Sequence, residues 1–102
     1  MGRRRPWQPP PCAYIMASGP HGMLYVGSTW NLVGRVWHHK NDVVESHTKR
    51  HRIHTLVWYE PQDTLENAIL RERRLKRYSR PRKIALIETM NPEWHDLYSV
   101  LL

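Results

Sequence analysis

Short apolar segments alternate with polar runs along the chain, and three of these segments have the composition of β-strands. Residues 12–17 (CAYIMA) and 23–27 (MLYVG) flank the turn-forming sequence SGPHG, which predicts an antiparallel hairpin. Residues 55–59 (TLVWY) predict a third strand, which we expect to end before Pro61. Together these segments predict a small antiparallel sheet.

The spacing of apolar residues becomes helical after the hairpin. Thr29 or Asn31 can cap a helix that runs to about Lys40. The apolar side of this helix consists of Leu32, Val33, Val36 and Trp37. The polar residues 41–52 that follow are expected to be partly helical.

A second long helix is predicted from residue 64 to about residue 78. A capping box of Asp63 and Glu66 opens it, and Pro81 breaks it. Residues 84–88 then form a short apolar segment, and the Asn-Pro pair at 91–92 begins a last helical piece. The order strand, strand, helix, strand, helix, helix predicts an α+β domain, in which helices flank a three-stranded antiparallel sheet.

The length and charge of the chain limit its architecture and its partners. With 102 residues it fits one compact domain, assigned to residues 11–102, after a flexible basic arm over residues 1–10. The formal net charge is +7 and arginine outnumbers lysine twelve to four, which favours a polyanion such as nucleic acid. No apolar run approaches the roughly 18 residues that span a bilayer. We therefore expect a cytoplasmic protein with no membrane partner; no feature predicts its oligomeric state.

One acid has an unusual position in the second long helix. Glu72 falls near the middle of the apolar side, which consists of Leu65, Ala68, Ile69 and Leu75. A carboxylate that faces the core is costly unless a cation compensates it. Three interpretations remain open: Glu72 pairs with an arginine of the protein, the helix turns it to solvent, or it holds a bound metal.

Four further polar residues are candidates for a site. Tyr14 and Tyr25 lie on the two strands of the hairpin and can be cross-strand neighbours on one face. Arg35 and His39 are four residues apart on the first helix, so they are neighbours on its surface. Each pair also has an ordinary interpretation, as strand aromatics and as a solvated helix face.

The order and spacing of these residues resemble the GIY-YIG nuclease family. The resemblance is carried by Ala13-Tyr14-Ile15-Met16, Tyr25-Val26-Gly27, Arg35-x-x-x-His39 and a helical Glu72. It extends over about residues 12–98 and is greatest to the stand-alone single-domain branch, which is related to the N-terminal nuclease module of the bacterial excision-repair excinuclease. The family has two signature triplets. Here the first reads Cys12-Ala13-Tyr14 and keeps only the tyrosine, and the second reads Tyr25-Val26-Gly27. Asn91 is the candidate for the asparagine that many relatives carry after the glutamate helix.

The resemblance implies a metal-dependent endonuclease that hydrolyses DNA phosphodiester bonds in repair or recombination, directed by DNA structure rather than sequence. Glu72 would hold one Mg²⁺ or Mn²⁺ ion. Tyr14 or Tyr25 would position or deprotonate the attacking water, and Arg35 would contact the scissile phosphate. His39 would form hydrogen bonds and relay protons. The expected partner is DNA, including single-stranded or branched DNA; the alternative is a binding module of the same fold with little or no catalysis.

A basic stretch over residues 71–83 contains eight basic residues and a single acid. It predicts a track for the DNA backbone, or else a solvated basic face. The residues assigned to nucleic-acid binding are Gly27, Lys40, Lys49, Arg71, Arg74, Lys76, Arg77, Arg80 and Lys83.

Histidines and tryptophans complete the candidates. The spacing of His47, His51 and His54 allows a structural zinc site, as an alternative to surface histidines near phosphate. Trp7, on the arm, is available to stack on a base. The tryptophans expected in the core are Trp30, Trp37, Trp58 and Trp94.

Overall fold

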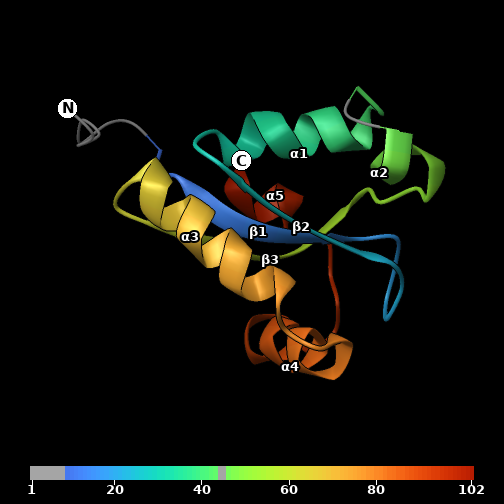
Figure 1. The fold of residues 1–102 in the computed structure, drawn as a ribbon. Helices are drawn as coiled ribbons and strands as arrows, with labels where there is room; N and C mark the ends of the chain where they lie inside the picture. Colours follow the sequence, from blue (N-terminus) through green and yellow to red (C-terminus); the bar gives the residue numbers. More distant parts are fainter. Residues whose placement is uncertain (1–8, 44–45) are drawn as a thin grey trace.

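A three-stranded antiparallel sheet forms the centre of the molecule (Figure 1). The computed structural model describes residues 9–43 and 46–102, with only the backbone of residues 46 and 47. The strands are β1 (Cys12–Ala17), β2 (Leu24–Thr29) and β3 (Thr55–Pro61), and their spatial order is β2-β1-β3. The predicted α+β class and antiparallel sheet are therefore confirmed, whereas most of the basic arm lies outside the described residues.

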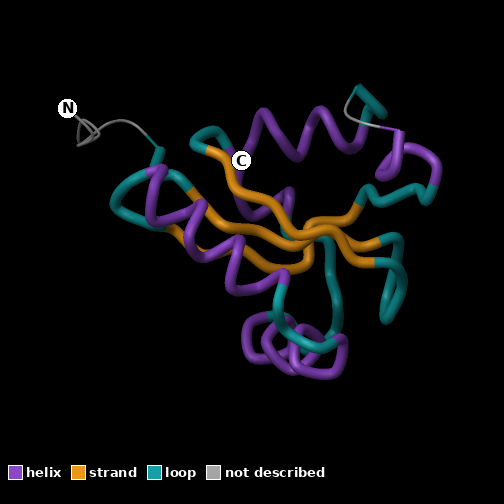
Figure 2. Tube along the Cα trace, in the orientation of Figure 1, coloured by secondary structure: helices purple, strands orange, loops and turns teal. Residues whose placement is uncertain are grey.

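Helices cover both faces of this sheet (Figure 2). The helices are α1 (Leu32–Lys40), α2 (Ser46–Arg50), α3 (Leu65–Lys76), α4 (Arg80–Met90) and α5 (Tyr98–Leu101). α3 and α4 lie on one side of the sheet, whereas α1 and α5 lie on the other (Figure 1). Among the described residues, no helix is long and apolar enough to cross a lipid bilayer.

Two apolar cores result from the alternation of side chains along the central strand β1, which is buried throughout. Ala13 and Ile15 pack toward α3 and α4, where they meet Leu75 and Ile87. The alternate positions of β1, Cys12, Tyr14 and Met16, pack toward α1 in a core that also contains Leu32 and Val36 of α1 and Leu56 of β3. Burial raises the pKa of the Cys12 thiol to about 11, so this cysteine is a protonated core residue at neutral pH.

The predicted hairpin is confirmed, with small changes at its strand ends. β2 extends to Thr29, and the turn is closed by a backbone hydrogen bond from Ser18 N to Met23 O of 3.0 Å. β3 includes Pro61 rather than ending before it. β3 lies at the sheet edge, where a residue without an N–H group is tolerated if it faces away from the neighbouring strand.

Side-chain caps fix the starts of the two predicted helices. The side chain of Asn31 accepts a hydrogen bond from Gly34 N and begins α1, one of the two caps predicted. α3 begins differently from the prediction: Thr64, not Asp63, accepts from Asn67 N at 3.1 Å. A threonine hydroxyl one residue later satisfies the same group of free N–H donors, so the helix starts one residue further along.

The C-terminal third departs most from the predicted elements. Pro81 does not simply end a helix, because Ser79 caps a new one and the proline lies in its first turn. Proline suits that position because the first N–H groups of a helix have no partner within it. α4 therefore contains the apolar residues 84–88, Asn91 ends it, and the last helix begins only at Tyr98.

Candidate active site

Tyr14, Tyr25 and His39 form an aromatic cluster between the sheet and α1. The apolar side of α1 packs on β1 and brings His39, which is 1% exposed, against Tyr14, also 1% exposed. The Tyr14 hydroxyl lies 3.2 Å from His39 Nε2. The Tyr25 ring centroid is 5.1 Å from that of His39 and 6.4 Å from that of Tyr14. The two tyrosines thus share one face of the hairpin, and Tyr25 is the more exposed of the two.

Gly27 gives the Tyr14 ring its space. Tyr14 and Gly27 are directly opposite each other on β1 and β2. A Cβ at Gly27 would lie 2.5 Å from the Tyr14 hydroxyl oxygen and 2.6 Å from Cζ, which no real side chain tolerates. The space that the missing side chain of Gly27 leaves is therefore filled by an aromatic ring of the protein itself.

Glu72 contacts β2 on the opposite face of the sheet from the aromatic cluster. Ser28 follows Gly27, and its hydroxyl donates a hydrogen bond of 2.5 Å to Glu72 Oε1. Lys76, one turn later on α3, lies with its Nζ 2.6 Å from Glu72 Oε2. The Glu72 side chain is 20% exposed, whereas that of Lys76 is 57% exposed. Of the three interpretations of this acid, pairing with a protein cation is present in the structure, although the cation is a lysine.

The family comparison matches the GIY-YIG catalytic domain model over residues 10–85. This chain belongs to the GIY-YIG family. It is also 36% identical over 66 residues to the UPF0213 protein SSP2268 of Staphylococcus saprophyticus, an alignment that covers 65% of this chain and 80% of that protein. No solved structure matches the chain. The matched range contains both tyrosine strands, Arg35, His39 and Glu72, so membership indicates a nuclease-type function.

Arg35 occupies the exposed side of α1 in this GIY-YIG domain, one turn before His39. Within residues 9–43 and 46–102, no hydrogen bond or ion pair joins Arg35 to Glu72. The structure thus assembles the tyrosine–histidine cluster and the Glu72–Ser28 pair, and leaves Arg35 in solvent beside the cluster.

Besides Lys76, which pairs with Glu72, three of the residues assigned to nucleic-acid binding are engaged within the protein. Lys40 contacts Asp96 and donates to His54 O at 3.0 Å. Arg80 donates to His21 O at 2.5 Å and to Gly22 O at 2.9 Å, which ties α4 to the hairpin turn. Arg71, the third, pairs with Glu60 on β3 at 2.8 Å.

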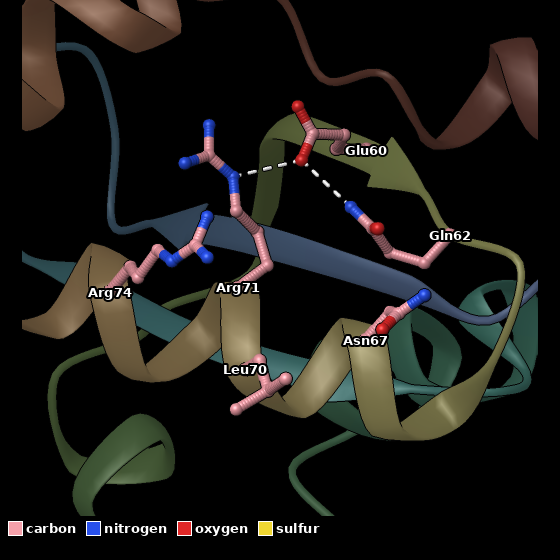
Figure 3. A pocket seen from close by; sticks show the side chains of 6 residues that line it. All are labelled: Glu60, Gln62, Asn67, Leu70, Arg71 and Arg74. Carbon is pink, nitrogen blue, oxygen red and sulfur yellow. Dashed lines mark hydrogen bonds and ion pairs between the residues drawn. The ribbon is translucent and has the colours of Figure 1, made fainter.

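A hollow of about 320 Å³ surrounds the Arg71–Glu60 pair (Figure 3). Glu60 Oε1 also accepts a hydrogen bond of 2.8 Å from Gln62, and the Arg74 side chain extends along the same side of α3 (Figure 3). The hydrogen bond from Arg71 also lowers the pKa of Tyr78. Because Arg71 faces β3 and Glu72 faces β2, this hollow and the acid lie on opposite flanks of α3.

The outer side of α3 remains a basic surface of the GIY-YIG domain. A second hollow of about 460 Å³ is lined there by Leu70, Arg73, Arg74, Lys76 and Arg77. Lys49 on α2 is exposed, and Lys83 on α4 is half-buried. We call the exposed residues Arg73, Arg74, Lys76 and Arg77 the α3 basic face.

Asn91, the possible further site residue, is 3% exposed and fully engaged with the main chain. Its Nδ2 donates to Val57 O at 3.1 Å and to His95 O at 2.8 Å, and its Oδ1 accepts from His95 N at 2.9 Å. The structure gives Asn91 the role of joining the end of α4 to β3.

The expectation that four tryptophans lie in the core is half wrong. Trp58 and Trp94 are buried, but Trp30 is 68% exposed and Trp37 is 49% exposed. Apolar character alone does not distinguish a core position from the end of an edge strand. Ser28 carries no sequence motif of its own, although strand alternation places it toward α3.

Proposed function

We propose that this GIY-YIG domain is a cytoplasmic, metal-dependent endonuclease that hydrolyses DNA phosphodiester bonds in repair or recombination, directed by DNA structure rather than sequence. The observation that supports this proposal most is that the tyrosine–histidine cluster and Glu72 both contact the same edge strand, β2. β2 carries Tyr25, which belongs to the tyrosine–histidine cluster, Gly27, which faces Tyr14, and Ser28, which bonds Glu72. Because β2 is an edge strand, a DNA backbone along its open side can reach both groups.

The surroundings of Glu72 fit a hard divalent cation. Mg²⁺ prefers oxygen ligands and keeps several waters, so one carboxylate together with phosphate oxygens is sufficient. Glu72 offers a partly exposed carboxylate, positioned by Ser28 at Oε1. Its second oxygen faces an exposed lysine, and an i,i+4 pair of this kind contributes only about 0.3–0.5 kcal/mol. Bound there, Mg²⁺ or Mn²⁺ would stabilise the charge on phosphorus and on the leaving oxygen.

Tyr14 and Tyr25 differ in burial, and this difference suggests different catalytic roles for them. Tyr14 is 1% exposed and bonded to His39, whereas Tyr25 is only partly buried. Tyr25 is therefore the tyrosine that can meet the attacking water, and Tyr14 and His39 position its ring. A free tyrosine has a pKa of about 10, so a base role requires a positive charge nearby. Arg35 and the bound cation are the candidates for that charge.

The α3 basic face supports DNA as the partner. Its cations are exposed on the helix that carries Glu72, so they can contact phosphates that flank the cut. Such contacts position a backbone without distinguishing bases, which fits recognition of DNA structure. The alternative function is binding of nucleic acid with little or no catalysis.

One experiment separates these two functions. Purified wild type and Glu72→Ala are incubated with end-labelled single-stranded, duplex and branched DNA, in Mg²⁺, in Mn²⁺ or in EDTA. We expect wild type to cut at least one substrate only with the metal, and Glu72→Ala to bind the same substrate without cutting it. Binding by wild type without cleavage of any substrate in either metal would establish the binding module instead.

A further inference from the structure

Trp30 is the tryptophan that the fold leaves most exposed among the described residues, at 68%. Trp58 and Trp94, by contrast, are 3% and 5% exposed and stabilise the core on the α3 side of the sheet. An indole is among the largest apolar groups in a protein, and the exposed part of the Trp30 ring contributes none of that stabilisation. Burial at position 30 therefore stabilises the fold much less than burial at Trp58 or Trp94.

Its place in the chain puts Trp30 next to the proposed active site. It directly follows β2, in the connection to α1 (Figure 1). Ser28, which hydrogen-bonds Glu72, and the buried Thr29 end β2, and Trp30 occupies the bend that follows, two residues from Ser28. At about 3.3 Å per residue, the Cα atoms of Ser28 and Trp30 are within roughly 7 Å of each other.

The backbone on both sides of Trp30 is fixed by hydrogen bonds. Asn31 N donates to Thr29 Oγ1 at 3.0 Å, and Gly34 N donates to Asn31 Oδ1 at 3.1 Å. The indole is thus presented from an ordered connection rather than from a loose loop. An exposed aromatic ring held in this way is suited to stacking on a flat ligand.

The charges around this connection favour a nucleotide as that ligand. The acid next to this connection is Glu72, which accepts from Ser28, while the chain itself carries no acidic residue from 1 to 41, and the exposed Arg35 follows five residues after Trp30. Aromatic rings among cations are the usual platform for single-stranded nucleic acid, because every base has a face on which to stack. A base inside a duplex has both faces covered by its neighbours and cannot use such a ring.

We propose that Trp30 stacks on an unpaired nucleobase next to the scissile phosphate, so that the domain prefers single-stranded or unstacked nucleotides to intact duplex. This inference rests on the proposed nuclease function and specifies its substrate. Two tryptophans expected in the core, Trp30 and Trp37, are exposed in the structure, and the proposal gives Trp30 a stacking role.

The test compares DNA with and without bases, in EDTA so that nothing is cut. The full chain is titrated with labelled oligothymidine, with an abasic backbone of the same length and with a matched duplex. We expect wild type to bind oligothymidine most tightly. Trp30→Ala should weaken that binding by roughly 5- to 100-fold and leave abasic binding unchanged. Trp30→Phe, which keeps a stacking ring, should retain most of the affinity.

Trp37→Ala is the matched control. Trp37 is also exposed, but it lies two residues beyond Arg35 on α1, about 200° around the helix. Its loss should leave all three affinities unchanged. Equal weakening of oligothymidine and abasic binding by Trp30→Ala, or an equal effect of Trp37→Ala, would overturn the stacking role while leaving the nuclease proposal intact. If wild type binds none of the three ligands, the proposed function itself fails.

Discussion

Tyr14 and Gly27 face each other across two strands so closely that the glycine has no room for a side chain. A Cβ at position 27 would lie 2.5 Å from the hydroxyl oxygen of Tyr14. The same hydroxyl lies 3.2 Å from His39 Nε2, so Gly27, Tyr14 and His39 form one packed unit that ends beside Tyr25. Gly27, the glycine of the second signature triplet, thereby sets the position of Tyr14, the tyrosine of the first.

Gly27→Ala should displace the Tyr14 ring. We expect a loss of roughly 1–3 kcal/mol in the free energy of unfolding, the usual cost of overpacking a core. We also expect slower cleavage, because the Tyr14–His39 pair no longer supports Tyr25. Gly19→Ala is the control, since a Cβ there meets nothing within 4 Å. Urea titration and a cleavage assay measure the two effects, and equal behaviour of both variants would contradict this packing.

Phenylalanine substitutions distinguish the two tyrosines. Tyr25→Phe should reduce the cleavage rate by on the order of 100-fold or more, because it removes the hydroxyl that we propose contacts the attacking water. Tyr14→Phe removes the hydrogen bond to His39 and should reduce the rate less. Single-turnover rates with saturating enzyme measure both effects. A larger loss in Tyr14→Phe, at unchanged DNA affinity, would transfer the base role to Tyr14.

Asn91→Ala tests whether Asn91 belongs to the site or to the fold. Three hydrogen bonds to the main chain are lost at a buried position, so the free energy of unfolding should fall by roughly 2–4 kcal/mol. The cleavage rate of the molecules that remain folded should not change. Asn67→Ala is the control: Asn67 is an exposed residue of α3, and its loss should change the free energy of unfolding by no more than about 0.5 kcal/mol. A normally stable Asn91→Ala protein that does not cut would instead place Asn91 in the site.

The strands and the helix that carries Glu72 could be predicted because their signals are local. The turn sequence SGPHG, the apolar runs and the stripe that contains Glu72 each lie within one element. α4 could not be predicted because Pro81 suggests a break, and only the Ser79 cap shows that it begins a helix. The exposure of Trp30 depends on where an edge strand ends, which no residue pattern indicates.

The partners of the cations could not be predicted because they come from distant parts of the chain. Lys40 meets Asp96, 56 residues later, and Arg80 meets the hairpin turn, 58 and 59 residues earlier. The basic stretch therefore divides into cations engaged in the fold and cations available to a ligand. Sequence composition does not distinguish the cations engaged in the fold from those available to a ligand.

The salt dependence of DNA affinity distinguishes cations that contact DNA from cations engaged in the fold. Arg74 and Arg77 belong to the α3 basic face, so changing each to alanine should reduce the slope of log affinity against log salt concentration by about 0.7–0.9. Arg80→Ala should leave the slope unchanged and lower the melting temperature, because Arg80 bonds the hairpin turn. Equal slope changes in all three variants would mean that Arg80 contacts DNA as well.

Glu72→Gln tests the metal-holding role of Glu72 most directly. Glutamine keeps the length of the side chain and an oxygen that accepts from Ser28, but it removes the charge that would hold the cation. The measurement is the single-turnover cleavage rate at saturating enzyme and Mg²⁺, with DNA affinity measured in parallel. We predict a rate lower by roughly 1000-fold, from the several kcal/mol that a bound metal contributes to the transition state, with affinity within about twofold of wild type. A Glu72→Gln protein that cuts as fast as wild type would contradict this role.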